Sequence, residues 1–204
     1  MGDLILYTNP LSRGRTARWM LEEIGADYST VVLDYDTTMK APEYLAVNPM
    51  GKVPALRHHD TVVTELAAIC AYLADAFPDA GLAPPPGERG AYYRWLFFAA
   101  GPLEAAVTAR ALHQEQPDKE RMLGYGTVDR TLDVVERALS DGPYLAGDHF
   151  TAADLYLGAQ ITFGILMKIV EPRPAFTEMI ARMTARPAYV RARSIDDSLA
   201  GRTD

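Results

Sequence analysis

One short stretch, Asn48-Pro49-Met50-Gly51-Lys52-Val53-Pro54, constrains the fold more than any other part of the sequence. Proline cannot donate a ladder hydrogen bond, so Pro54 belongs at the start or the edge of a strand, and X-Pro is the peptide bond that readily adopts the cis form. If the Val53-Pro54 bond is cis, the N–H and C=O of Val53 point outward and can pair with an extended peptide. The simpler alternative is an edge strand that begins with proline.

About ten residues later, Thr64-Glu65-Leu66 opens an Ala-rich helix. The free N–H groups and the positive dipole end of a helix suit a carboxylate. A strand that pairs with a peptide, beside a site for an anion, predicts a receptor for a small acidic peptide. An ordinary helix cap is the alternative here.

Composition narrows the functional classes. The 204 residues suffice for one or two domains with a sizeable core, and the net charge of -7 argues against a nucleic-acid partner. The single cysteine, Cys70, excludes a disulfide framework and a CxxC redox pair, which suits a reducing cytoplasm. We find no leader sequence before Leu4 and no apolar run of the roughly 20 residues that a membrane span needs. These features predict a soluble cytoplasmic protein.

The first part of the chain alternates strand and helix patterns. Leu4 to Tyr7 is a short apolar run that Thr8-Asn9-Pro10 ends, and a helical pattern runs from Ser12 to Gly25. Because this helix separates the first strand from the next, the two should run parallel. The remaining elements are a strand at 28–33, an irregular stretch with a short helix at 43–47, a hairpin at 53–57 and 61–63, and a helix at 65–77. The prediction is an α/β domain at residues 1–78 with a four-stranded mixed sheet. Along the chain, its strands and helices follow in the order β-α-β-α-β-β-α.

A stretch with four prolines and two glycines follows at 78–87 and predicts a domain linker, bounded at 79–87. Residues 88–204 lack strand patterning and predict an all-helical domain, with a long helix broken at Gly101-Pro102. Inside it, Thr151 and Asp154 have the spacing of a capping box, which indicates a role in folding.

The order of these parts resembles the cytosolic glutathione S-transferases, from Leu4 to about Ala192. The resemblance rests on a thioredoxin-like first half, the Asn-Pro-x-Gly-Lys-Val-Pro and Thr-Glu-x-x-Ala-Ile motifs, the proline linker and the capping box. It implies glutathione as a co-substrate, with no further cofactor. No metal is expected, because the adjacent His58 and His59 point apart on a strand or tight turn and no third ligand is nearby. The resemblance also implies a cis Val53-Pro54 bond beside which the Val53 backbone pairs with the cysteinyl part of glutathione.

The same resemblance assigns the remaining glutathione contacts. Lys52 corresponds to the residue that meets the glycyl carboxylate, and Glu65 to the acid that receives the γ-glutamyl ammonium. Leu66 is a departure, because the family usually has Ser there, so only its backbone N–H can bind the γ-glutamyl carboxylate. Asn9 in the loop after the first strand, Arg15 in the first predicted helix, and Pro54 complete the expected binding set.

Catalysis in this family requires glutathione as a thiolate. Lowering a thiol pKa of about 8.5 by two units takes about 2.7 kcal/mol, within reach of one or two hydrogen bonds directed at the charge and a helix N-terminus. The family uses Ser or Tyr after its first strand, and here Ser12 resembles the Ser-type bacterial classes while Tyr7 is the alternative. Arg13 or Arg15 would add positive potential. Other interpretations stay open: backbone groups near Asn9 or Ser12, no activation at all, or Arg13, Arg15 and Arg18 as a solvated helix face.

The second substrate should be a small hydrophobic electrophile, bound near Leu11 and the long helix after the linker. The expected walls are Leu11, Tyr93, Phe97 and Arg110. The resemblance predicts a transferase of the detoxification type and a homodimer. The alternatives are a glutathione-dependent disulfide or peroxide reductase, and a non-catalytic binding module of the same fold.

Overall fold

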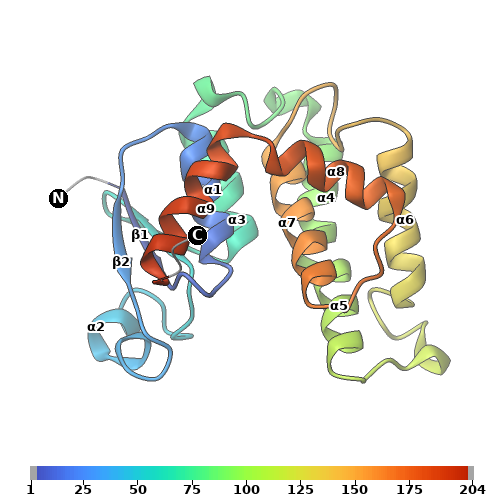
Figure 1. Cartoon of the computed structure of the whole chain (residues 1–204), viewed down its shortest axis with the longest axis horizontal. Coiled ribbons are helices and arrows are strands. Elements are labelled where there is room, and N and C mark those ends of the chain that lie inside the picture. Colours follow the sequence, from blue (N-terminus) through green and yellow to red (C-terminus); the bar gives the residue numbers. More distant parts are fainter. Residues whose placement is uncertain (1–3, 202–204) are drawn as a thin grey trace. The chain divides into compact units, whose positions relative to one another are not determined.

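A computed structural model describes residues 4–201 and divides the chain into two compact units, shown in Figure 1. The first unit combines Met1–Gly81 with Ala185–Asp204, and the second is Leu82–Thr184. No helix within residues 4–201 combines the length and the apolar character needed to cross a bilayer.

The sheet of the first unit has the predicted four strands. They are β1 (Leu4–Thr8), β2 (Ser29–Val32), β3 (Ala55–His58) and β4 (Thr61–Thr64), in the spatial order β2-β1-β3-β4. β1 pairs in parallel with β2 and antiparallel with β3, and β3 pairs antiparallel with β4. β3 begins one residue after Pro54, because proline has no N–H to donate to the ladder. The thioredoxin-like arrangement expected from the sequence is confirmed.

Helices α1 (Gly14–Ile24), α2 (Pro42–Leu45) and α3 (Leu66–Ala76) complete the first part of this unit. Short 3₁₀ turns lie at Thr38–Lys40 and Pro78–Ala80. The core is formed by fully buried side chains of the strands and helices, among them Leu6, Met20, Leu21, Leu56, Ile69 and Leu73. α1 ends at Gly25, whose φ of 68° gives the left-handed turn that closes the helix.

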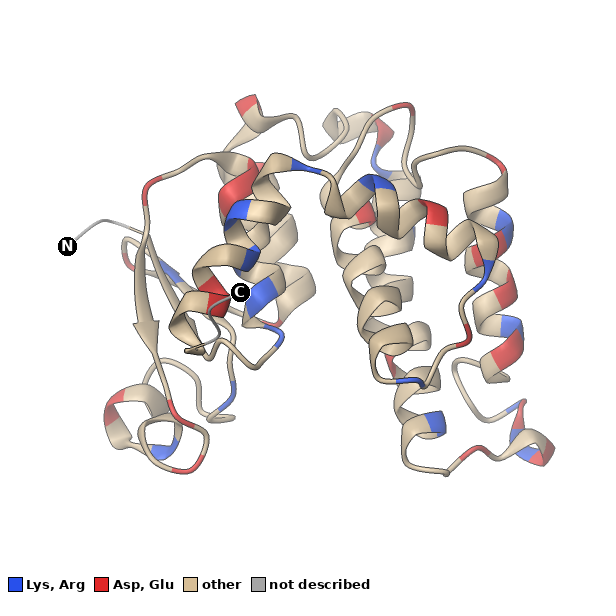
Figure 2. Ribbon diagram, in the orientation of Figure 1, with Lys and Arg blue, Asp and Glu red and all other residues tan. Residues whose placement is uncertain are grey.

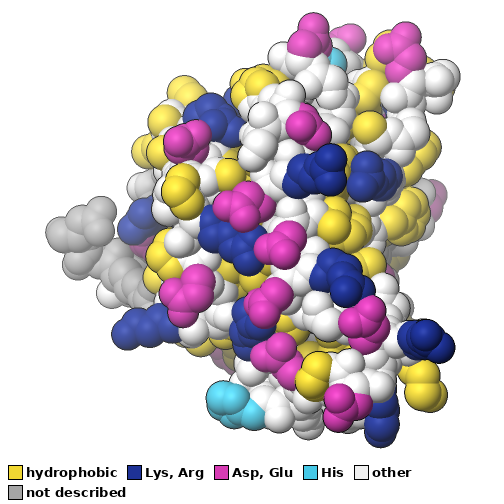
Figure 3. All heavy atoms as spheres, turned by 90° about the vertical axis from the view of Figure 1, so that its right-hand side faces the viewer, with side chains coloured by type: hydrophobic (Ala, Val, Ile, Leu, Met, Phe, Trp, Pro, Cys, Tyr) yellow, Lys and Arg dark blue, Asp and Glu magenta, His cyan; other side chains and the backbone are white. Residues whose placement is uncertain are grey.

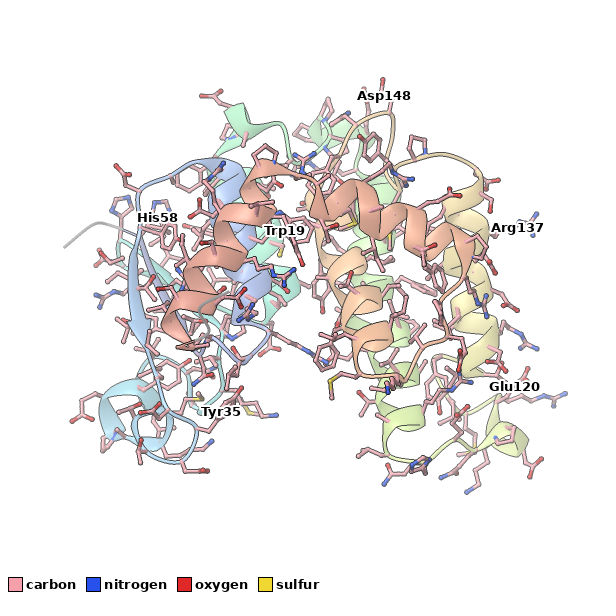
Figure 4. The ribbon with its side chains drawn as sticks, in the orientation of Figure 1. Trp19, Tyr35, His58, Glu120, Arg137 and Asp148 are labelled. Atoms are coloured by element: carbon pink, nitrogen blue, oxygen red, sulfur yellow. The ribbon has the colours of Figure 1, made fainter. Side chains whose placement is uncertain are left out.

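The C-terminal helix α9 (Pro187–Leu199) belongs to the first unit, which differs from the helical domain expected at 88–204. α9 packs on α1, where Trp19 meets the ring of Tyr189 edge-on with 5.0 Å between centroids (Figure 4). Both helices have acidic and basic residues (Figure 2), and these form ion pairs between α1 and α9. The helical pattern of α9 is readable from the sequence, but the packing partner of α9 is not.

The second unit is all-helical, as expected. Its helices are α4 (Gly90–Phe98), α5 (Glu104–Ala111), α6 (Val128–Ser140), α7 (Ala152–Leu166) and α8 (Pro174–Thr184), with 3₁₀ turns at Pro86–Glu88 and Pro117–Lys119. α4 and α5 are joined by a π-helical segment, Ala99–Leu103, which contains Pro102. Proline lacks the N–H that an α-helix needs, so the predicted break takes the form of a local π turn.

The capping box at the start of α7 is present. The Thr151 N–H donates to Asp154 Oδ2 at 2.9 Å, and Asp154 Oδ1 accepts from the Leu145 N–H at 2.7 Å. Figure 3 shows the side of this unit around α6, where basic and acidic side chains are interspersed. Arg130 with Glu120 and Arg173 with Asp133 are two of its ion pairs. This face therefore presents no extended basic surface.

Candidate functional site

The loop after β1 is shaped by the side chain of Asn9, which is buried. Asn9 Nδ2 donates to the Leu33 C=O at 2.8 Å, and Asn9 Oδ1 accepts from the Leu11 N–H at 2.9 Å. The amide thus joins the ends of β1 and β2 and turns the chain toward α1. The sequence suggested Asn9 as a ligand-binding residue, whereas in the structure both ends of its amide hold the loop.

Ser12 lies in this loop, half-buried, two residues before α1. Its hydroxyl donates to the Asn9 C=O at 2.7 Å and accepts from the Gly14 N–H at 2.9 Å. Arg13, not Ser12, is the N-cap residue of α1. The Ser12 hydroxyl therefore stands at the N-terminal end of a helix, and it can donate to an incoming anion by giving up the Asn9 carbonyl.

Close packing requires a glycine at the start of α1. A Cβ added to Gly14 would lie 1.9 Å from Thr8 Oγ1, which is closer than any Cβ contact allows. The missing side chain lets α1 begin directly against the end of β1, and this places the loop with Ser12 at the edge of the sheet.

Tyr7, the alternative to Ser12, lies on β1 with its ring among apolar neighbours. Its ring is 5.6 Å from that of Tyr44 and packs against the buried cluster of Leu33, Met39, Tyr44 and Ala55. Val47 and Val53 are partly buried against the same cluster. The ring of Tyr7 therefore packs against the same buried cluster as Val53.

The Val53-Pro54 peptide bond is cis, as expected. The carbonyl just before Val53, that of Lys52, accepts from Tyr44 Oη at 2.5 Å and from Asn48 Nδ2 at 2.8 Å. Burial raises the pKa of Tyr44 from 10 to about 12, so the phenol remains a hydrogen-bond donor even in alkaline solution near pH 10. Among residues 4–201, no loop or turn hydrogen bond from another backbone group reaches the N–H or C=O of Val53.

The loop before Lys52 is tight and needs glycine. Gly51 has a φ of 57°, its C=O accepts from Lys40 Nζ at 2.7 Å, and a Cβ here would lie 3.0 Å from the Met39 C=O. Lys52 itself is exposed and Val53 is half-buried. Sequence reasoning did not assign roles to Tyr44 or Asn48, although the Asn that opens the Asn-Pro-x-Gly motif was a signal for the second.

Glu65 is the N-cap residue of α3, with φ 65° and ψ 116°. A non-glycine residue with positive φ is strained, and such residues persist where the surroundings or the function require them. Glu65 is exposed and directly precedes α3, which begins at Leu66, and its side chain makes no capping hydrogen bond to this helix. The structure thus presents an acid and a helix N-terminus together, as the sequence suggested, but the backbone strain has no sequence signal.

The basic residues of α1 contact protein partners. Arg15 Nε donates to the Pro10 C=O at 2.5 Å, and Arg15 Nη2 pairs with Asp197 of α9 at 2.7 Å. Arg18 is buried, and its Nε pairs with Asp196 Oδ1 at 2.8 Å. The alternative of a solvated basic face is therefore wrong for Arg18, and the guanidinium of Arg15, an expected glutathione contact, is held by the loop and by α9.

The residues expected to bind an electrophile differ in availability. Leu11 in the loop of the first unit is 61% exposed, and Phe97 on α4 of the second unit is 71% exposed. Tyr93, one turn before Phe97, is also exposed. Arg110 instead pairs with Glu115 at 3.0 Å and with Asp129 at 2.8 Å. The guanidinium of Arg110 is therefore already paired with carboxylates of the second unit.

The comparisons with known proteins decide the family. A family profile described as Glutathione S-transferase, N-terminal domain, matches residues 12–76, and one described as Glutathione S-transferase, C-terminal domain, matches residues 58–163. The chain belongs to the glutathione S-transferase family. Glutathione S-transferase GstA of Escherichia coli O157:H7 is 30% identical over 188 residues, which cover 89% of this chain and 93% of that protein. Glutathione S-transferase 3 of Zea mays is 35% identical over 76% of this chain and 75% of that protein.

Solved structures of this family share the fold. A glutathione transferase from Methylococcus capsulatus is 32% identical, with a TM-score of 0.80 over 96% of this chain and 99% of that one. A sphingomonad glutathione S-transferase, solved in complex with glutathione, is 27% identical, with a TM-score of 0.77 over 94% and 98% of the two chains. The protein is thus homologous to glutathione transferases over most of its length.

Proposed function

We propose that this protein binds glutathione in its first unit and transfers the thiolate to small hydrophobic electrophiles. The observation that supports this most strongly is the Val53 segment, where two side chains fix the Lys52 carbonyl and leave the backbone groups of Val53 open to an extended peptide. Main-chain pairing of this kind gives affinity, and side-chain groups at the two ends give specificity. Those end groups are Lys52 for the glycyl carboxylate, and Glu65 with the Leu66 N–H for the γ-glutamyl end.

In this proposal Ser12 stabilises the thiolate. Its hydroxyl exchanges the Asn9 carbonyl for the sulfur as acceptor, while still accepting from the Gly14 N–H at the start of α1. A hydrogen bond to a charged group contributes about 1.5–3 kcal/mol, and a helix N-terminus about 0.3–1 kcal/mol. Their sum matches the roughly 2.7 kcal/mol that lowers a pKa by two units. Arg13, the N-cap residue, adds positive charge nearby, and Tyr7 remains the alternative donor.

The proposal extends to the second substrate and the assembly. Of the residues expected to contact an electrophile, Leu11, Tyr93 and Phe97 are exposed, whereas Arg110 drops out because its charge is paired. We expect a cytoplasmic homodimer on the family resemblance. Chemistry through a protein thiol is not part of the proposal, because burial raises the pKa of Cys70 to about 12.

The test compares turnover with binding in two single variants. Conjugation of chlorodinitrobenzene is measured at about pH 6.5, and glutathione affinity by calorimetry, for Ser12→Ala and Tyr7→Phe. If Ser12 alone lowers the thiol pKa of bound glutathione by two units, its loss reduces the thiolate fraction at pH 6.5 from about one half to about one hundredth. Ser12→Ala then lowers turnover by roughly 50-fold, while the dissociation constant for glutathione changes little. Equal turnover in Ser12→Ala would remove Ser12 from this role, and a large loss in Tyr7→Phe would assign it to Tyr7.

A substrate panel separates the two enzymatic alternatives. Conjugation of an aryl halide without reduction of disulfides or peroxides supports the transferase, and the reverse pattern supports a glutathione-dependent reductase. Failure to bind glutathione at all would contradict both and leave a non-catalytic module.

A further inference from the structure

Arg15 contacts the loop at Pro10 and at Ser12 itself. Its side-chain Nε donates to the C=O of Pro10 at 2.5 Å, and its backbone N–H donates to the C=O of Ser12 at 3.3 Å. The position of the loop around Ser12 therefore depends on where the Arg15 side chain is held.

Asp197 of α9 holds the other end of that side chain. Arg15 Nη2 lies 2.7 Å from Asp197 Oδ1, and the two side chains are 30% and 18% exposed. Arg15 also holds the pKa of Asp197 below its usual range, mainly through this hydrogen bond. A guanidinium is a rigid planar fork, so fixing Nη2 fixes the direction in which Nε points.

α9 is itself firmly seated beside this pair. The neighbouring residue, Asp196, forms the buried ion pair with Arg18 at 2.8 Å, and Trp19 packs on Tyr189. The carboxylate of Asp197 thus has a defined place relative to α1. A continuous series of contacts runs from α9 through the Arg15 guanidinium to the Pro10 carbonyl and the loop that contains Ser12.

We propose that Asp197 is a positioning residue that acts through Arg15 to hold the Ser12 loop in the geometry that activates the thiol. Its place in catalysis rests on the proposed function, since that proposal gives Ser12 its role. It reassigns Arg15 from a glutathione contact to a support of the loop. It also gives the last helix of the chain a part in the chemistry of residues at its beginning.

The first test needs no glutathione. Amide hydrogen exchange of the peptide covering residues 9–14 is measured in the full chain for wild type, Asp197→Ala and Arg191→Ala. Arg191 is a matched control, because it joins α9 to α1 through Glu22 at 3.0 Å, at a different place from the loop contacts. Arg193→Ala, which removes the other partner of Asp197, is a second control. We expect protection of residues 9–14 to fall about tenfold in Asp197→Ala alone. Equal protection in Asp197→Ala and the controls would overturn the proposal.

The second test follows the chemistry. Asp197→Ala should raise the midpoint pH of thiolate formation on bound glutathione and lower kcat by roughly threefold to tenfold, with KM for glutathione little changed. Asp197→Asn keeps an oxygen acceptor for Arg15 Nη2 and should recover most of the loss. If bound glutathione forms no thiolate on the wild-type protein, the proposed function is contradicted. Hydrogen exchange would still show whether Asp197 holds the Ser12 loop through Arg15. An active wild type with an unchanged midpoint in Asp197→Ala would overturn the positioning role.

Discussion

Glu65 combines a strained backbone with an exposed side chain. Its φ of 65° is a conformation that costs a non-glycine residue of the order of 1–3 kcal/mol. Its carboxylate is exposed, so contacts with the rest of the chain do not explain the choice of residue. The strain is understandable if the acid is needed where the ammonium group of glutathione would lie.

Replacing Glu65 therefore separates stability from binding. Glu65→Gly should raise the free energy of unfolding by about 1 kcal/mol, because glycine adopts positive φ without strain, and should weaken glutathione binding at least tenfold. Glu65→Gln is the matched control, since it keeps the strain and removes the charge. Denaturant unfolding and calorimetry measure the two effects. A Glu65→Gly protein less stable than wild type would show that the side chain supports the fold.

Among the elements, α1 and α9 are joined by a buried ion pair. Arg18 Nε and Asp196 Oδ1 are 2.8 Å apart, and Arg18 Nη1 donates to Tyr28 Oη at 3.1 Å and to Thr30 Oγ1 at 3.0 Å. Within residues 4–201, Arg18 Nη2 and Asp196 Oδ2 are buried without a hydrogen-bond partner. A buried pair whose hydrogen bonds are incomplete adds little net stability, but the loss of one partner leaves an unpaired charge.

We therefore expect strong non-additivity between substitutions at Arg18 and Asp196. Arg18→Met should lower the free energy of unfolding by about 3–5 kcal/mol, whereas the double variant Arg18→Met with Asp196→Leu should lie close to wild type. Denaturant unfolding of Arg18→Met, Asp196→Leu and the double variant gives the coupling free energy between the two side chains. Additive losses would mean that the two side chains contribute independently to the packing of α9.

The order of the elements was predictable from the sequence, whereas the contacts that join distant elements were not. The hydrophobic patterns and the turn residues that bound them predicted the four strands, and the motif at 48–54 indicated the cis bond before Pro54. Pairs such as Arg15 with Asp197 join residues 182 positions apart, and many acidic residues could have been the partner. The same holds for the Tyr44 hydroxyl on the Lys52 carbonyl, which depends on the path of the loop.

At the scale of the whole molecule, the chain returns to its first unit after completing the second. Residues 82–184 form one unit, and the chain then adds α9 to the unit in which it began. A linker rich in proline and glycine suggested a single crossing between domains at 79–87. No comparable proline- and glycine-rich stretch marks the return near Ala185, so the sequence grouped residues 88–204 into one helical domain, whereas the compact units place α9 with the first unit.

This division predicts which segments loosen together. In Arg18→Met, hydrogen exchange should accelerate in the peptides of α1 and α9 and stay unchanged in those of α6 and α7, because the lost pair lies in the first unit. Exchange mapped by mass spectrometry on the intact chain is the measurement. Joint loosening of α9 with α7 and α8 would instead support one helical domain from residue 88 onward.

In the proposed function, this site binds glutathione and stabilises its thiolate. The most direct test is the ultraviolet thiolate absorbance of glutathione at saturating protein, followed from about pH 5 to pH 10. Because Cys70 is buried with a pKa of about 12, the protein thiol does not contribute over this range. We predict a midpoint about two units below the free value of about 8.5. A midpoint at the free value would contradict the claim and show that the fold is present without thiol activation.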